Sequence, residues 1–223
     1  MNVCALIAAF NEEATVASVV EGVRRLVDDV VVVDYGSRDR TGERAAAAGA
    51  TVVRHAQNRG KGAAIRTGLA HVLAGPHTHV LFIDADLQHD PADVPKLLSA
   101  GERAGCDVVI GERLFVKGSM PVSRFYSNRV GSWLLSQFIG LEVSDSQSGF
   151  RLIRSDCLRP LRLAATGYEI ETEMLIKLAR RQASLCRVSI PARYDGARSR
   201  LRPFRDTCRT CLLAVWYRCA AGR

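Results

Sequence analysis

The chain has 223 residues, of which 48% are hydrophobic and 24% charged, and its formal net charge is +8. This is the composition of an ordinary globular protein, which argues against the disordered and fibrous classes, and the length suits one sizeable domain. The excess of basic residues favours phosphate-bearing partners, such as nucleotide sugars, lipid phosphates, anionic membranes or nucleic acid.

The first half of the chain alternates between apolar runs and helical periods. Short apolar or β-branched runs predict buried strands at 3–9, 30–33, 51–53, 80–83 and 107–110. Helical periodicity predicts intervening helices at 14–26, 41–49, 63–74 and 91–100. Asn11 is expected to cap the first of these helices. The alternation predicts an α/β fold with a mostly parallel sheet and helices on both faces.

The second half of the chain is less regular. Helices are predicted at 121–139, 169–180 and 206–219, and strands at 150–153 and 188–190. The last of these strands is expected at a sheet edge, because Pro191 follows it. Residues 180–223 are rich in arginine and contain only two acids, Asp195 and Asp206, which is typical of an interaction surface.

The helix predicted at 169–180 has two kinds of side chain. Ile170, Met174 and Leu178 recur at helical spacing and are expected in the core. Glu171 and Glu173 are candidates for supporting a functional site.

The seven cysteines are irregularly spaced. The chain runs directly into its first strand, so no signal peptide is predicted and reduced thiols in a cytosolic compartment are expected. Cys208 and Cys211 form a C-x-x-C pair, but no second pair or histidine cluster completes a zinc site. The sequence contains no run of 18 apolar residues, so no transmembrane helix is predicted.

Polar segments follow three of the predicted strands, at 11–13, 34–37 and 84–88. In open α/β sheets, ligands bind at the carboxyl ends of the strands. The three segments are therefore expected to meet at one edge of the sheet and to form the ligand site.

Asp84 and Asp86 come directly after the fourth predicted strand. Side chains alternate along a strand, so both carboxylates face the same side, where they repel each other unless a cation lies between them. Hard oxygen ligands favour Mg²⁺ or Mn²⁺, which can then bridge a diphosphate. Gln88 adds a neutral oxygen, and His89 is a weaker candidate ligand. The alternative interpretation is a solvated loop whose acids start the next helix.

Seven segments of the chain together resemble a known family. They are IAAFNEE at 7–13, VVVDYGSRDRT at 31–41, NRGKGAAIRTG at 58–68, IDADLQHDP at 83–91, GER at 111–113, DSQSGFR at 145–151 and GYEIETEMLIK at 167–177. In this order they are similar to the inverting family 2 glycosyltransferases, and within them to the dolichol-phosphate and polyprenyl-phosphate mannose synthases. The resemblance implies a single GT-A (Rossmann-like) domain, with a nucleotide-sugar half at 1–110, an acceptor half at 111–202 and an amphipathic helix at 203–223.

The resemblance also implies roles for individual residues. The donor would be held by Ala8, Phe10, Glu12, Asp34, Tyr35, Asp84 and Ala85. A metal, Mg²⁺ or Mn²⁺, would be held by Asp84, Asp86 and Gln88. The predicted catalytic residues are Asp86 and three cations near the phosphates, Arg113, Arg124 and Arg200. Ser127 would lie in the acceptor region, and Arg200 would belong to a mobile loop that closes over the diphosphate.

Two further cations have alternative interpretations. Lys61 and Arg66 either serve the nucleotide site or are a helix cap and a solvated cation. The segment around Lys61 is no Walker loop, because the required G-x-x-x-x-G-K-[ST] spacing is absent.

Two residues depart from the family pattern. Ala8 stands where the family has proline, which is expected to loosen the loop. Tyr35 replaces the second aspartate of the family's D-D-G-S turn, the residue that contacts the base in relatives. Tyr35 can stack on the base instead, or the base preference has changed. GDP-sugars and UDP-sugars therefore both stay open as donors.

The resemblance implies an inverting, metal-dependent transfer of a sugar, mannose or glucose, from a nucleotide sugar to a polyprenyl or dolichyl phosphate. A phosphate acceptor is already anionic and needs no carboxylate base, so positioning and charge neutralisation would carry the catalysis. The enzyme is expected at the cytoplasmic face of the membrane, bound through its basic C-terminal helix or a membrane-anchored partner subunit. Two alternatives stay open. One is a soluble transferase with a hydroxyl acceptor, and the other is a non-enzymatic module that binds phosphate or nucleic acid. The chain lacks the aromatic-rich motifs of nucleic-acid binders, so no nucleic-acid partner is expected.

Overall fold

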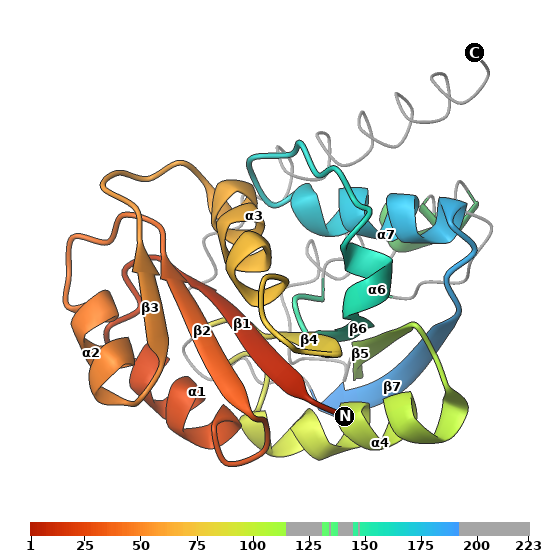
Figure 1. The fold of residues 1–223 in the computed structure, drawn as a ribbon, viewed down its shortest axis with the longest axis horizontal. Helices are drawn as coiled ribbons and strands as arrows, with labels where there is room; N and C mark the ends of the chain where they lie inside the picture. The colour runs from red at the N-terminus through yellow and green to blue at the C-terminus, as the bar shows by residue number, and fades with distance from the viewer. Residues whose placement is uncertain (115–130, 134, 138–144, 147, 192–223) are drawn as a thin grey trace.

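The computed structural model describes residues 1–114, 131–133, 135–137, 145–146 and 148–191. A seven-stranded sheet runs through this part of the chain in the order β3-β2-β1-β4-β6-β5-β7 (Figure 1). The strands are β1 (Val3–Ala9), β2 (Asp29–Asp34), β3 (Thr51–Arg54), β4 (His79–Phe82), β5 (Val108–Leu114), β6 (Arg151–Arg154) and β7 (Leu185–Pro191).

Neighbouring strands are parallel except at β6, which is antiparallel to both β4 and β5. The predicted α/β fold with a mostly parallel sheet is therefore confirmed, and β7 lies at the sheet edge as expected. The direction of β6 was not predicted, because the apolar pattern of a buried strand is the same in either direction.

Helices cover both faces of the sheet (Figure 1). They are α1 (Val16–Val23), α2 (Thr41–Ala47), α3 (Lys61–Val72), the 3-10 helix η1 (Pro91–Asp93), α4 (Val94–Ala104), α6 (Ser155–Leu158) and α7 (Ile170–Arg180). One core lies between the sheet and α3, α6 and α7, and the other between the sheet and α1, α2 and α4. Strand β1 serves both, because Cys4 and Leu6 face the first core while Ala5 and Ile7 face the second.

Helix α1 starts later than predicted, and Asn11 is not its cap. Asn11 has a φ of 49° and lies in a turn before the helix. Its backbone N–H donates to Ser37 Oγ at 2.8 Å, and its Oδ1 accepts from the Arg38 N–H at 2.8 Å. The short polar side chain of asparagine tolerates this left-handed conformation, and here it links the turns that follow β1 and β2.

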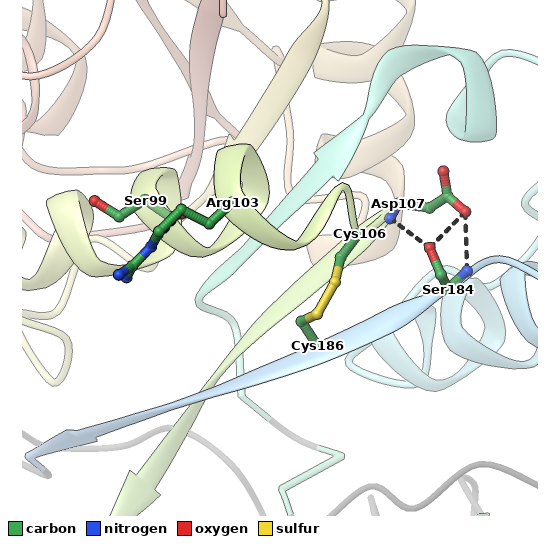
Figure 2. The surroundings of a disulfide bond; sticks show 6 residues. All are labelled: Ser99, Arg103, Cys106, Asp107, Ser184 and Cys186. Carbon is green, nitrogen blue, oxygen red and sulfur yellow. Dashed lines mark hydrogen bonds between the residues drawn. A yellow bond between two sulfur atoms is a disulfide. The ribbon is translucent and has the colours of Figure 1, made fainter.

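Cys106 and Cys186 form a disulfide, with their Cα atoms 5.9 Å apart (Figure 2). The prediction of reduced thiols is therefore wrong for this pair. The parallel pairing of β5 with β7 places Val109 opposite Cys186, which brings Cys106 to the same end of the sheet across 80 residues of sequence. Asp107 and Ser184 reinforce the junction, because the Asp107 N–H donates to Ser184 Oγ and the Ser184 N–H to Asp107 Oδ2, both at 2.9 Å.

Several predicted features fall wholly or partly outside the described residues. Of the helix predicted at 121–139, residues 131–133 and 135–137 are described and are helical. The basic loop, the C-terminal helix at 203–223 and the Cys208–Cys211 pair lie outside the described residues. Among the helices that are described, none has the length and apolar character needed to cross a membrane.

Candidate active site

The three predicted polar segments do meet at one edge of the sheet. Strand β1 lies between β2 and β4 and is parallel to both, so the carboxyl ends of all three strands point the same way. Several hydrogen bonds tie the turn after β1 to the region after β2. Among them, the Asn11 N–H donates to Ser37 Oγ and the Glu12 N–H to Thr41 Oγ1, both at 2.8 Å. The third segment, 84–88, follows β4 on the other side of β1.

Asp34 organises the turn after β2. Its side chain is fully buried, and its Oδ1 accepts from the N–H groups of Gly36 at 3.2 Å and Ser37 at 2.8 Å. Arg54 Nε lies 3.4 Å from the other carboxylate oxygen. A nucleoside could reach this carboxylate only if the turn rearranged, so the donor contact predicted for Asp34 stays a prediction.

Tyr35 and Phe10 form an aromatic pair at the same edge. Their ring centroids lie 5.3 Å apart with an angle of 19° between the ring planes. Tyr35 is largely buried, and its N–H donates to the Ala9 carbonyl at 3.1 Å.

A groove of about 480 Å³ lies at the end of β3. It is lined by a basic segment to which the sequence assigned no part in the functional site: Arg54, His55, Ala56, Gln57 and Arg59.

Asp84 and Asp86 lie in the loop after β4, as predicted, but in different surroundings. Lys61 Nζ lies 2.6 Å from Asp84 Oδ1. Asp86 instead accepts two hydrogen bonds from Gln88, one from its backbone N–H at 3.1 Å and one from its side-chain Nε2 at 2.8 Å. Gln88 thus orients Asp86, and Leu87 makes this tight turn possible by adopting a φ of 60°.

The pKa values of Asp84 and Asp86 are shifted in opposite directions. Burial by itself would raise the pKa of Asp84, but the nearby positive charges, of which Lys61 is the foremost and Arg113 another, together hold this pKa below its usual value. Burial, together with the negative charge of Asp84, raises the pKa of Asp86 to about 6. Asp86 therefore carries a negative charge at neutral pH that the described residues compensate poorly.

This donor set fits a divalent cation. Two carboxylates offer hard oxygen atoms, and Mg²⁺ or Mn²⁺ bound to proteins commonly takes its other ligands from substrate phosphates and water. Within the described residues, no group of three or more His, Cys, Asp or Glu side chains is arranged to hold a metal by itself. The site therefore suits a metal that arrives with, or is completed by, a diphosphate.

His89 does not belong to this donor set. It is buried, and its ring stacks on Phe150 with a centroid distance of 5.3 Å. Burial, together with the positive charge of Arg113, lowers the pKa of His89 to about 4. Its place in the structure is therefore that of a neutral ring packed behind the acidic loop.

Comparison with known proteins decides the family. Residues 4–162 match the family described as glycosyl transferase family 2. The chain is a family 2 glycosyltransferase.

Relatives of this glycosyltransferase have related activities. Glycosyltransferase AglJ of Haloferax volcanii is 33% identical over 211 residues, covering 92% of this chain and 68% of the relative. The undecaprenyl-phosphate mannosyltransferase of Micrococcus luteus is 33% identical over 193 residues, covering 81% and 79%. A crystal structure of glucosyl-3-phosphoglycerate synthase from Mycobacterium tuberculosis, with Mn²⁺ and UDP-glucose, superimposes with a TM-score of 0.78 at 28% identity, covering 98% of this chain and 79% of that one. The fold is thus GT-A, and the enzyme acts on a nucleotide sugar.

Besides Lys61, two further predicted cations of the glycosyltransferase are engaged within the protein. Arg113 forms a two-pronged ion pair with the buried Asp145, from Nε at 2.6 Å and from Nη2 at 2.9 Å. Arg66 donates to the carbonyl oxygens of Ala164, at 3.1 Å, and Ala165. Arg66 is therefore not the solvated cation that one interpretation expected, and it joins α3 to the segment before α7.

The remaining predicted residues are placed as follows. Ala8 is half-buried beside a small cavity, Ala85 is buried, and Glu12 accepts from Thr15 Oγ1 at 3.4 Å. Arg124, Ser127 and Arg200 lie outside the described residues. Asp145 and Gly149 were not assigned individual roles from the sequence, although both lie in the family segment at 145–151, which was the available signal.

Proposed function

We propose that this enzyme transfers a hexose, with inversion, from a nucleotide sugar to a polyprenyl phosphate, with Mg²⁺ or Mn²⁺ held at Asp84 and Asp86. The observation that supports the metal site is that Asp84 and Asp86 differ in their cation partners. Lys61 forms an ion pair with Asp84, whereas the half-buried Asp86 has no cation within ion-pair distance among the described residues. The relatives named as undecaprenyl-phosphate and dolichol-phosphate mannosyltransferases support the acceptor.

In the proposed reaction, an oxygen of the lipid phosphate forms a bond to the anomeric carbon of the sugar. The bond from that carbon to the diphosphate breaks, and the nucleoside diphosphate leaves with the electron pair. A divalent cation would neutralise the charge that develops on this leaving group. The acceptor oxygen is already ionised, so no side chain has to remove a proton from it. What the chain supplies is the position of the carboxylates and the exclusion of water.

Cations of the acceptor half would hold the lipid phosphate. Arg113 is the described candidate, and Arg124 and Arg200 are proposed with it on the family resemblance. The Arg113 guanidinium is fixed by Asp145, which leaves it oriented rather than free to rotate.

The experiment is a transfer assay with the purified enzyme, Mn²⁺ and either GDP-mannose or UDP-glucose as donor. We expect a sugar-phosphate lipid with polyprenyl phosphate as acceptor, and the donor comparison identifies the base. Asp86→Ala is expected to lower the rate at least about 100-fold, because it removes the principal charge that would hold the metal. Asp156→Ala, at a surface carboxylate with 79% exposure, is the matched control and should leave the rate unchanged. Full activity of Asp86→Ala with excess chelator would contradict the metal site.

One observation favours a second candidate function. The structural neighbour glucosyl-3-phosphoglycerate synthase covers almost the whole chain, and it has been crystallised with UDP-glucose and phosphoglyceric acid. We therefore include 3-phosphoglycerate as an acceptor in the same assay. Transfer to 3-phosphoglycerate without transfer to the lipid would replace the proposed acceptor while leaving the metal site intact.

A further inference from the structure

The first turn of α3 packs directly against the backbone of the segment that precedes α7. The Gly62 N–H donates to the Thr166 carbonyl at 2.8 Å. A Cβ atom on Gly60 would overlap the Thr166 carbonyl oxygen, and one on Gly62 would overlap the Ala165 carbonyl oxygen. The two glycines therefore let the segment before α7 lie directly against the first turn of α3.

Between these glycines, Lys61 directs its side chain toward the acidic loop. Its ammonium lies 2.6 Å from Asp84 Oδ1 and 2.6 Å from Glu171 Oε1, and the side chain is only 8% exposed. The ammonium also lies 5.5 Å from the centre of the Tyr168 ring. Lys61 thus joins the loop after β4 to the first turn of α7, which is 110 residues away in sequence.

Neighbouring residues enclose the ion pairs of Lys61 with Asp84 and Glu171. Gly149 packs so tightly on Asp84 that a Cβ would overlap its second carboxylate oxygen. Arg151 is buried and donates to the Glu171 carbonyl at 2.9 Å, which fixes the start of α7. The cavity that these residues line measures about 20 Å³, which is room for about one water molecule. The Lys61 ammonium is therefore largely shielded from bulk solvent.

We propose that Lys61 is a positioning residue for Asp84, and that Glu171 is the counter-charge that keeps Lys61 from repelling the metal. This inference rests on the proposed metal site. A lone ammonium 2.6 Å from a metal-binding carboxylate would disfavour a second cation there. Glu171 balances the ammonium, so the pair fixes the geometry of Asp84 without adding net charge to the site. The same contact makes the metal site depend on how α7 is docked.

A charge-balanced double variant tests the inference. Lys61→Met with Glu171→Gln removes one positive and one negative charge, so a change in metal affinity reports on position and not on net charge. We expect Mn²⁺ binding to the enzyme, measured by electron paramagnetic resonance in the presence of UDP or GDP, to weaken by about 10- to 100-fold. Turnover should fall at least as far, while the KM for the acceptor stays unchanged.

The matched control is Lys96→Met with Asp93→Asn, which removes an ion pair of the same 2.6 Å length at the start of α4. It should leave Mn²⁺ affinity and turnover at wild-type values. If the Lys61 and Glu171 double variant also binds Mn²⁺ and turns over like the wild type, the inference is overturned.

The double variant removes Lys61 and Glu171 together, and Asp84, which loses its ion pair, keeps a side chain that is 27% exposed to solvent. Thermal unfolding checks that the variant is folded. Should its thermal unfolding transition be lost, Glu171→Gln alone decides the question. Its uncompensated Lys61 should weaken Mn²⁺ binding about tenfold, and unchanged affinity would overturn the inference. Failure of the proposed function looks different, because the wild type itself would then bind no Mn²⁺, or Asp86→Ala would bind it equally well.

Discussion

At the scale of single residues, Gly149 shows how closely the acidic loop is held. The space that its side chain would occupy is filled by the carboxylate of Asp84. We predict that Gly149→Ala displaces this carboxylate and lowers turnover by up to about 100-fold, since a misplacement of about 1 Å can have that effect. Steady-state kinetics with saturating donor measures the loss, and thermal unfolding shows that the protein remains folded.

Gly75→Ala is the comparison for this variant. Gly75 lies in a turn after α3, where a Cβ would approach only the edge of the His77 ring and the Val72 carbonyl. The turnover of Gly75→Ala is expected to match that of the wild type. Wild-type turnover in Gly149→Ala as well would mean that Asp84 tolerates the displacement or does not take part in the reaction.

The sequence predicted some of this site and could not predict the rest. The convergence of the loops after β1, β2 and β4 follows from strand direction alone, and so does the proximity of Asp84 to Asp86. The partners of Asp84 could not be predicted in this way, because Lys61 lies 23 residues away and depends on the docking of α3. Gln88 was expected to offer its oxygen to a metal, and this contact stays a prediction; what the sequence did not indicate is that its amide nitrogen donates to Asp86.

At the scale of elements, α3 and α7 are joined by the segment at 163–167. Glu173 on α7 accepts from the N–H groups of Ala164 and Ala165, and Lys177 lies 2.7 Å from Glu173. In the same segment, the Thr166 carbonyl accepts from the Gly62 N–H of α3, and the Ala164 and Ala165 carbonyls accept from Arg66 of α3. These N–H groups of the segment therefore bond to α7, and these carbonyl groups bond to α3.

Gly62→Ala tests how much this docking stabilises the fold. Within a helix, alanine is intrinsically favoured over glycine by about 0.5–1 kcal/mol, so propensity alone predicts a more stable protein. Overlap with the Ala165 carbonyl oxygen opposes this gain, because backbone cannot move aside as a side-chain end can. We expect a net loss of about 1–3 kcal/mol in the free energy of unfolding, measured by denaturant titration.

The control for Gly62→Ala is the same change at Gly101 in α4. A Cβ there would meet the end of the buried Leu152 side chain within 3 Å, and a side-chain end can yield further than a backbone carbonyl can. Stability should change little or rise slightly. A stabilised Gly62→Ala would show that the segment at 163–167 does not need to lie against α3.

The elements themselves were largely predictable, whereas their long-range relations were not. Apolar runs located the strands within a few residues, because a buried strand must be apolar. The antiparallel direction of β6 and the disulfide between Cys106 and Cys186 depend on which strands become neighbours. Local sequence carries no direct signal for either.

At the scale of the whole molecule, basic charge and one exposed aromatic side chain bear on where the enzyme works. The net charge is +8, and acids are scarce in 180–223, where only Asp195 and Asp206 occur. Among the described residues, Trp133 is a large hydrophobic side chain with 60% exposure. Tryptophan and cationic residues are both favoured at the interface of an anionic membrane.

These features predict that the enzyme binds to membranes that carry negative charge. In a flotation assay, the full chain should rise with vesicles of phosphatidylcholine and phosphatidylglycerol, but not with phosphatidylcholine alone. Raising the salt from about 0.1 M to about 1 M should release most of it, since the Debye length falls from about 10 Å to about 3 Å. Removal of 203–223 should weaken flotation further than Trp133→Ala does, because it deletes several arginines as well as Trp216. Equal flotation of the shortened chain, with its transfer activity intact, would assign membrane binding to another part of the molecule.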